Sequence, residues 1–313
     1  MAESIQSICI QDNTLTWIQG RAEGNQLIIE SVLESALPVP IQYDQLDKKA
    51  APLQIANHLN YLAKANELAL EVARITIPTK FGLIRKVLVD QAIPQGSYTQ
   101  IVRGELSYIL TSPVEEYYLY LPPYERSLDQ LKEILSVAVR KNLFQFFKKI
   151  ADEAHFRIDV LTFNAFPVDH LYRELFGDQI GQVLLVNFTE FGFEYVLSDE
   201  KDFIHAGFFP FSSQLQSIQE VNEEEILAAF ESMLSDFKNL GGEEDALYAA
   251  SQILVFGYFF QNNWLDQLEA RAGIPVKILN PLESSRWEID VQIQELDSYN
   301  VHRFIEPFAN LLP

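Results

Sequence analysis

Two polar turns far apart in the sequence stand where a nucleotide phosphate could bind, yet both lack the glycine that such a site needs. The first turn is Gln11-Asp12-Asn13-Thr14, which follows the apolar run 7–10. The second is Asn187-Phe188-Thr189, which follows the apolar run 183–186. A phosphate-binding turn uses glycine so that backbone N–H groups can approach the anion. Asn13 and Thr189 occupy the glycine positions here.

Each turn belongs to a similar unit, in which an apolar strand, a short polar turn and a returning strand follow one another. Each unit continues through a second polar turn, at 21–26 or at 198–202, into a third strand. A unit repeated in this way predicts a duplicated fold of two lobes, with one hairpin in each lobe and a cleft between them. Both polar turns are expected to face that cleft.

Periodicity and turn residues predict the remaining elements and an α/β fold with mixed sheets. We expect a first lobe over residues 1–180, with an inserted subdomain at about 80–155, and a second lobe over 181–313, with a helical insertion at about 213–250. The pattern predicts helices near 52–69, 97–110, 143–154, 164–175, 223–240, 264–272 and 303–312, and strands near 72–78, 84–89, 115–121, 133–139, 158–163, 252–256 and 273–279.

Composition excludes several classes of function. The chain has 313 residues and a formal net charge of −21, so it is expected to bind neither nucleic acid nor an anionic membrane surface. Its five histidines lack metal-ligand spacing, which predicts no metal site. The lone cysteine, Cys9, excludes an internal disulfide and fits a reducing compartment. With no targeting peptide and no apolar run long enough to span a bilayer, a cytoplasmic protein without direct membrane insertion is expected.

The order of elements resembles the actin-like, ribonuclease-H-like fold, and more narrowly the PilM family of type IV pilus assembly and the cytoplasmic part of GspL. The segments that carry this resemblance are 74–80, 158–166, 183–196 and 273–281. Active relatives open with an Asp-x-Gly-x-Ser turn, whose aspartate and glycine positions fall here on Gln11 and Asn13. Asp12 is shifted by one residue, so its side chain is expected to point to the other face of the strand.

The other two nucleotide-contacting loops of the family are also altered. The second phosphate turn, Asp-x-Gly in relatives, contains Asn187 and Thr189. The glycine-rich adenosine turn becomes Gly257-Tyr258 followed by Phe259 and Phe260, and bulky rings are expected where a purine and ribose would lie. The resemblance therefore implies a degenerate nucleotide cleft, with no cofactor and no catalytic residues.

A tyrosine-rich segment in the expected inserted subdomain could line a binding groove. On a strand, Tyr118 and Tyr120 share one face while Tyr117 lies on the other, and Tyr124 follows in a proline-rich loop. One interpretation is packing within the sheet. The other is the rim of a peptide groove, because tyrosine combines a large contact area with a polar tip. Proteins that resemble this chain hold a short cytoplasmic peptide of a membrane partner between the first lobe and its inserted subdomain.

The last four residues, Asn310-Leu311-Leu312-Pro313, are similar to the core of the peptides that this family binds. The tail could therefore occupy its own groove or the groove of a neighbouring copy. In that case, its deletion would change the oligomeric state or raise the affinity for the partner.

Three functions remain open from the sequence. The favoured one is a non-catalytic actin-like adaptor at the cytoplasmic face of a pilus or secretion assembly, associated with the membrane through the peptide tail of a single-span inner-membrane protein. The alternative is an ATP- and Mg²⁺-binding relative in which Asp12, Asn187 and Gly257 contact the nucleotide. A small-molecule kinase is disfavoured, because no carboxylate stands where its catalytic base should be. Homodimerisation is left open.

Overall fold

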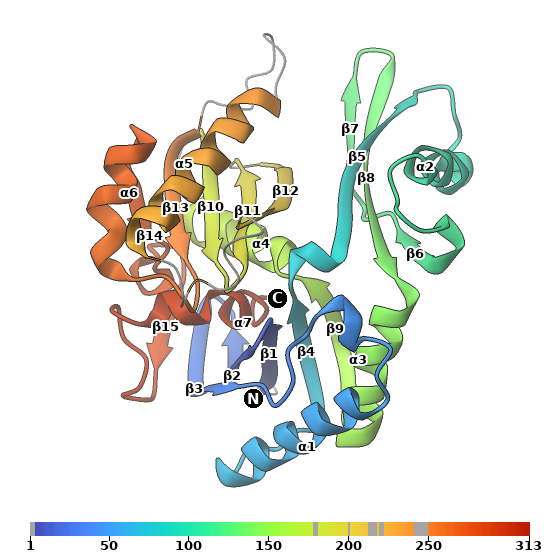
Figure 1. The fold of residues 1–313 in the computed structure, drawn as a ribbon. Coiled ribbons are helices and arrows are strands. Elements are labelled where there is room, and N and C mark those ends of the chain that lie inside the picture. The colour runs from blue at the N-terminus through green and yellow to red at the C-terminus, as the bar shows by residue number, and fades with distance from the viewer. Residues whose placement is uncertain (1–3, 178–180, 200, 212–217, 219–221, 241–249) are drawn as a thin grey trace.

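The computed structural model describes residues 4–177, 181–199, 201–211, 218, 222–240 and 250–313, and its strands form three sheets (Figure 1). The first lobe contains a six-stranded sheet in the order β15-β3-β2-β1-β4-β9, in which β4 and β9 run parallel to β1. Its strands are β1 (Ile5–Gln11), β2 (Thr14–Glu23), β3 (Gln26–Ala36), β4 (Val72–Ile77), β9 (Arg157–Phe163) and β15 (Glu288–Val291).

Four helices cover this sheet. The long helices α1 (Ala50–Ala65) and α3 (Lys141–Ala154) contact each other and bury apolar side chains in the main core. In contrast, α4 (Ala165–Phe176) and α7 (Ile305–Ala309) lie between the first sheet and the second lobe (Figure 1). Residues at the end of β1 and just after β4 also contact the second lobe directly.

The second lobe repeats the order of the first around its own core. Its sheet has the order β12-β11-β10-β13-β14, which matches β3-β2-β1-β4-β9 strand for strand. The predicted duplicated two-lobe fold is therefore confirmed. The strands are β10 (Gln182–Phe188), β11 (Gly192–Ser198), β12 (Phe203–Pro210), β13 (Ala250–Phe256) and β14 (Val276–Ile278), and the helices are α5 (Glu223–Leu240) and α6 (Leu265–Ala272). Much of the predicted insertion at 213–250 lies outside the described residues, which include α5 within that range.

The strands of the third sheet lie between β4 and α3 in the sequence, and this sheet forms the inserted subdomain (Figure 1). Strand β8 lies at its centre, paired with β5 on one side and with β6 and β7 on the other. Helix α2 (Tyr98–Ser107) packs on one face through Val102 and Leu106. The strands are β5 (Gly82–Asp90), β6 (Tyr117–Tyr120), β7 (Glu125–Leu128) and β8 (Leu131–Arg140). The sequence pattern does not predict β7.

The end of the chain departs from the predicted domain division. The sequence predicts that residues 181–313 form the second lobe, but β15 pairs with β3 and extends the first sheet. Helix α7 then packs on β1, β2 and β4. The reason is physical: the outer edge of β3 offers unpaired backbone groups, and a short strand from the tail satisfies them.

The C-terminal tail is held on the first lobe. The Arg74 guanidinium donates hydrogen bonds to the carbonyl oxygens of Asn310 (3.0 Å) and Leu312 (3.1 Å). The ring Nε2 of His170 lies 3.0 Å from the carbonyl oxygen of Pro313. Leu311 is fully buried, close to Gly20 on β2. The tail therefore docks on its own chain, against β2, β4 and α4.

Removing this docked leucine should destabilise the fold. We expect Leu311→Ala to lower the free energy of unfolding by about 2–5 kcal/mol, because it removes a fully buried side chain and leaves a cavity. Leu88→Ala, at a half-exposed leucine of β5, is the matched control and should change the free energy by less than about 1 kcal/mol. Urea denaturation followed by circular dichroism measures both. Equal effects would show that the tail adds little to stability.

Candidate functional site

The two predicted phosphate turns come together between the lobes, and a buried glutamate lies where they meet. Glu194, on β11 of the second lobe, is 4% exposed. Its Oε2 accepts hydrogen bonds from Gln11 Nε2 (3.2 Å), Asn164 Nδ2 (3.0 Å) and Asn187 Nδ2 (3.2 Å). Its Oε1 accepts the backbone N–H of Thr79 at 2.5 Å. Three segments of the first lobe and one of the second therefore converge on this carboxylate.

A second buried acid extends this group from the C-terminal helix. Oε1 of Glu306, on α7, accepts a hydrogen bond from Asn187 Nδ2 at 2.7 Å, so one amide bridges two carboxylates. Gln11, Thr79, Asn164, Asn187, Glu194 and Glu306 are called the interlobe cluster below.

Burial dominates the electrostatics of the cluster. It raises the pKa of Glu306 to about 8 and that of Glu194 to about 7, because a charged carboxylate loses its hydration there. The donors from Asn164 and Thr79 lower the pKa of Glu194, and that from Asn187 lowers the pKa of Glu306. A neighbouring negative charge raises the pKa of each glutamate, with Glu194 acting on Glu306 and Asp12 on Glu194.

Asp12 does not point to the opposite face of the strand, so the prediction from strand alternation is wrong. Strand β1 ends at Gln11, and Asp12 adopts a left-handed turn conformation (φ 52°), to which the alternation of strand side chains does not apply. Its carboxylate is buried and forms an ion pair with Lys80. Beside it, Asn13 Nδ2 donates to Glu190 Oε2 of the second lobe at 2.7 Å.

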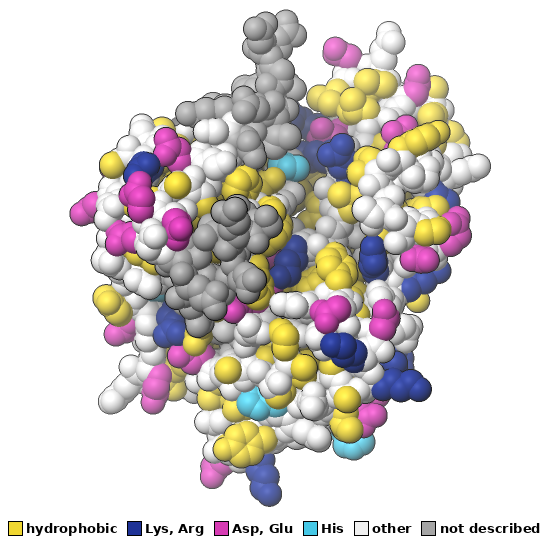
Figure 2. Space-filling model, in the orientation of Figure 1, with side chains coloured by type: hydrophobic (Ala, Val, Ile, Leu, Met, Phe, Trp, Pro, Cys, Tyr) yellow, Lys and Arg dark blue, Asp and Glu magenta, His cyan; other side chains and the backbone are white. Residues whose placement is uncertain are grey.

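The ammonium group of Lys80 lies beside the two predicted phosphate turns. It belongs to the short helical turn η2 (Thr79–Phe81), which leads from β4 into the inserted subdomain. Its ammonium nitrogen lies 5.0 Å from the ring centre of Phe191 and 5.6 Å from that of Phe208, both in the second lobe. Cation–π attraction and the Asp12 ion pair therefore hold this lysine between the lobes. Figure 2 shows Lys and Arg side chains beside the hollow that separates the second lobe from the inserted subdomain.

The third predicted loop is closed by the C-terminal segment. The Gly257 N–H donates to the carbonyl oxygen of His302 at 2.9 Å, and a His302 ring nitrogen lies 3.3 Å from the Gly257 carbonyl oxygen. Gly257 has a φ of 119°, and a Cβ here would lie 2.3 Å from Asn187 Oδ1, so only glycine fits. The Tyr258 ring lies under the guanidinium of Arg303, 4.3 Å from it.

These contacts use groups that a nucleotide would need. The Thr189 N–H and hydroxyl both bond the Gly192 carbonyl oxygen, so the second turn closes on itself. The Gly257 N–H is bonded to His302, and the carboxylate of Glu194 stands between the turns. In its ionised state, a buried carboxylate between the turns would repel a triphosphate.

Sequence reasoning missed Glu194, Glu306, Lys80 and Asn164. A signal for the two glutamates does exist, because each is a single acid within an apolar run, 191–197 and 304–309. An acid in such a run must be bonded when the run is buried. No local pattern reveals Asn164 or Lys80, because their partners lie far away in the sequence.

The four tyrosines of the predicted groove lie in three environments. Tyr118 and Tyr120 lie on one face, 42% and 62% exposed, and the Tyr118 ring packs edge-on against Phe144. Tyr117 lies on the other face, in the core with α2, and its hydroxyl accepts a hydrogen bond from Arg140. The Tyr124 hydroxyl bonds Lys86 and Glu133.

An apolar groove does run between the first lobe and the inserted subdomain, and it is called the edge groove below. Its cavity has a volume of about 430 Å³ and lies beside β9, the last strand of the six-stranded sheet. A neighbouring cavity of about 600 Å³ shares Phe144 and Leu161 with it and continues along β9 to Arg157. The edge groove is lined by Ile77, Tyr120, Pro122, Val137, Val139, Leu143, Phe144, Leu161, Thr162, Phe163 and Phe166.

The C-terminal tail does not occupy the edge groove. None of residues 310–313 lines it, and their contacts are with Arg74, His170 and the core near Gly20. The prediction that the tail could fill its own groove is therefore wrong for this structure. Arg74 and the buried leucines hold the tail elsewhere.

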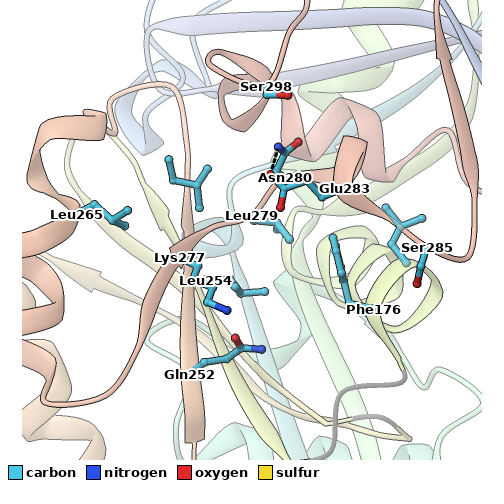
Figure 3. A pocket seen from close by; sticks show the side chains of 12 residues that line it. Phe176, Gln252, Leu254, Leu265, Lys277, Leu279, Asn280, Glu283, Ser285 and Ser298 are labelled. Atoms are coloured by element: carbon cyan, nitrogen blue, oxygen red, sulfur yellow. Dashed lines mark hydrogen bonds between the residues drawn. The ribbon is translucent and has the colours of Figure 1, made fainter.

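A further cavity of about 500 Å³ lies where α4 meets β13 and β14 (Figure 3). Asn280 Nδ2 and Glu283 Oε1 bond each other there at 2.8 Å, while Lys277 extends from β14 (Figure 3). Among the described residues that line this cavity there is no histidine, cysteine or aspartate.

Several solved structures are similar to this chain over nearly its whole length. A chain of the "PilM-PilN type IV pilus biogenesis complex" matches with a TM-score of 0.74 and 11% identity over 100% of both chains. A Bacteroides thetaiotaomicron protein of actin-like ATPase fold and unknown function matches with a TM-score of 0.51 and 9% identity, over 98% of this chain and 96% of that one. The cytoplasmic domain of EpsL, an inner membrane component of the type II secretion system of Vibrio cholerae, gives 0.49 and 8%, over 98% and 94%.

The first two likenesses show the actin-like fold and confirm the structural resemblance predicted from the sequence. No family model matches the chain, and no curated protein sequence is significantly similar to it. Within the described residues, no helix combines the length and the apolar character needed to cross a bilayer. The same residues contain no group of three or more His, Cys, Asp or Glu side chains that could hold a metal ion.

The buried acids predict a pH dependence of stability. The pKa of Glu306 is about 8 in the folded protein, against an ordinary value near 4.5, so its contribution is full below about pH 4.5 and is lost as the pH rises through 8. We expect the free energy of unfolding to fall between pH 5 and 8, by on the order of 1 kcal/mol for each step of one in pH. Glu306→Gln should flatten this slope.

Urea denaturation at several pH values between about 5 and 9 measures the slope. Glu105→Gln, at an exposed glutamate of α2, is the matched control and should keep the slope of the wild type. An unchanged slope in Glu306→Gln would show that Glu306 does not take up a proton on folding.

Proposed function

We propose that this chain is a non-catalytic, actin-like adaptor that binds an extended peptide of a membrane-anchored partner in the edge groove. The observation that carries the proposal is the groove itself, an apolar channel beside the outermost strand of a sheet. An extended peptide can pair with the backbone of such a strand while its alternate side chains enter pockets. Leu143, Leu161 and Val139 provide an apolar lining for them.

The rim of the edge groove suits a protein partner. Exposed Tyr118, Tyr120 and Phe144 stand together at its mouth, and aromatic side chains of this kind dominate binding energy at interfaces. The PilM–PilN structure supports the proposal, because a chain of the same fold belongs there to a pilus biogenesis complex. The proposed setting is accordingly the cytoplasmic face of a pilus or secretion assembly, reached through a partner with a single membrane span.

The proposed absence of nucleotide chemistry rests on the interlobe cluster. Glu194 and the Asp12–Lys80 pair lie beside the phosphate turns, and the Gly257 N–H is already bonded to His302. We propose that neither ATP nor Mg²⁺ is a cofactor, and that the cleft has a structural role. The alternative, an ATP-binding relative with altered loops, requires these contacts to break.

Calorimetry separates the adaptor from the ATP-binding alternative. We expect no heat of binding from Mg-ATP at micromolar to millimolar concentration, because the Thr189 and Gly257 N–H groups already have partners within the chain and Glu194 lies between the turns. A dissociation constant in the micromolar range would refute the adaptor proposal in its nucleotide-free form. Turnover of ATP with a small-molecule acceptor would support a kinase instead.

Peptide binding should depend on the rim of the edge groove. The probe is a short synthetic peptide with an Asn-Leu-Leu-Pro core, titrated by fluorescence anisotropy. Tyr120→Ala and Phe144→Ala should each weaken binding by about tenfold or more, because an aromatic anchor is lost. Tyr108→Ala is the matched control: this tyrosine of the same subdomain is 89% exposed and lies outside the groove, so affinity should not change. Equal affinity in all three variants would place the peptide elsewhere.

A further inference from the structure

The residues that line the edge groove are joined in the chain to those that bind Glu194. Phe163 lines the groove, and the next residue, Asn164, donates to the Glu194 carboxylate. Ile77 also lines the groove, and Thr79, two residues later, donates its backbone N–H to the same carboxylate. Glu194 of the second lobe therefore bonds both first-lobe segments within two residues of side chains that line the groove.

The two segments are also fixed to each other. Ile77 and Phe163 are partners in the β4–β9 ladder, and the Asn164 N–H donates to the Ile77 carbonyl oxygen at 2.9 Å. The Phe163 ring packs directly on Gly82, the first residue of β5. A Cβ at Gly82 would lie 2.3 Å from this ring. A displacement of Asn164 or Thr79 must therefore move the floor of the groove and the base of the inserted subdomain together.

We propose that Glu194 is a positioning residue for the edge groove, through which the second lobe sets the shape of that groove. The approach of the two lobes around Glu194 and the change of the groove to its peptide-binding shape are then one and the same equilibrium. Coupling of this kind is reciprocal: a peptide that fits the closed groove must also tighten the contacts of Glu194. The identity of the groove ligand rests on the proposed function, whereas the mechanical coupling does not.

The charges that face Glu194 define how the equilibrium responds to pH. Asp12 and Lys80 approach it from the turns, Glu306 from α7 and the buried Cys9 from β1. Because burial raises the pKa of Glu194 to about 7, closure takes up a proton, and the closed form is favoured as the pH falls below 7. A glutamine at this position cannot take up that proton.

Hydrogen–deuterium exchange of the free protein tests the coupling without any ligand. In Glu194→Gln, amide exchange in residues 158–163 of β9 should rise by about tenfold over the wild type at pH 6, because contacts to both groove segments weaken. After correction for intrinsic rates, exchange in the wild type should also rise between pH 6 and 8, and this rise should be smaller in the variant, in which Glu306 still titrates but residue 194 does not. Glu269→Gln, at an exposed glutamate of α6, is the control and should match the wild type.

A second variant keeps the test decisive if Glu194→Gln does not fold. Gln11→Met removes one donor to Glu194, and Gln11 does not line the groove. We expect about threefold faster exchange at 158–163 in this variant, because one of several hydrogen bonds to the carboxylate is lost. Wild-type exchange at 158–163 in the folded variants would overturn the proposal, even if the second lobe became more mobile.

The Asn-Leu-Leu-Pro peptide then tests reciprocity. When bound, it should slow exchange at 77–82 in the wild type and have a smaller effect in Glu194→Gln, whose affinity should fall by about tenfold. A loss of stability alone would not remove this ligand-dependent protection. If the wild type does not bind the peptide, the proposed function fails, while the exchange of the free protein still decides whether Glu194 shapes the groove.

Discussion

The buried carboxylate of Glu194 is the contact on which the placement of the two lobes depends. A carboxylate that loses its hydration must recover hydrogen bonds from the protein, or its burial is too costly. Here the donors come from the β1 turn, from the start of η2, from the residue after β9 and from β10. These four positions lie in two lobes and are far apart in the sequence, so the lobes must adopt one relative orientation to satisfy a single side chain.

The same requirement explains the chemistry of the cleft. In a duplicated fold of this type, the two hairpin turns face each other, and the space between them must be filled by a ligand, by water or by side chains. This chain uses side chains: Lys80 supplies a cation, Asp12 and Glu194 supply anions, and Asn187 bridges Glu194 and Glu306. The backbone N–H groups of Thr189 and Gly257, which could have served a ligand, are bonded within the protein.

The sequence predicted the scaffold better than the site, for physical reasons. Alternating strands, turn residues and helical periodicity are local signals, so the duplicated hairpins and the split of Tyr118 and Tyr120 from Tyr117 could be predicted. Strand β15 could not, because its four residues become a strand only when the edge of β3 is available. Asp12 was misplaced because a left-handed turn residue does not follow strand alternation. The partners of Glu194 are up to 183 residues away in the chain, and no local pattern reveals them.

The inserted subdomain gives the edge groove its particular geometry. The chain leaves the first sheet at the end of β4, builds the third sheet, and returns through α3 to form β9. The groove is therefore lined by Ile77 at the end of β4, by Val137 and Val139 of the subdomain, and by Phe163 at the end of β9. Thr79 and Asn164, which are bonded to Glu194, lie one or two residues from Ile77 and Phe163 of the groove, so the connections of the subdomain to the first sheet adjoin the floor of the groove. A subdomain attached in this way cannot tilt without changing the groove, so the shape of the groove and the packing of the lobes are linked.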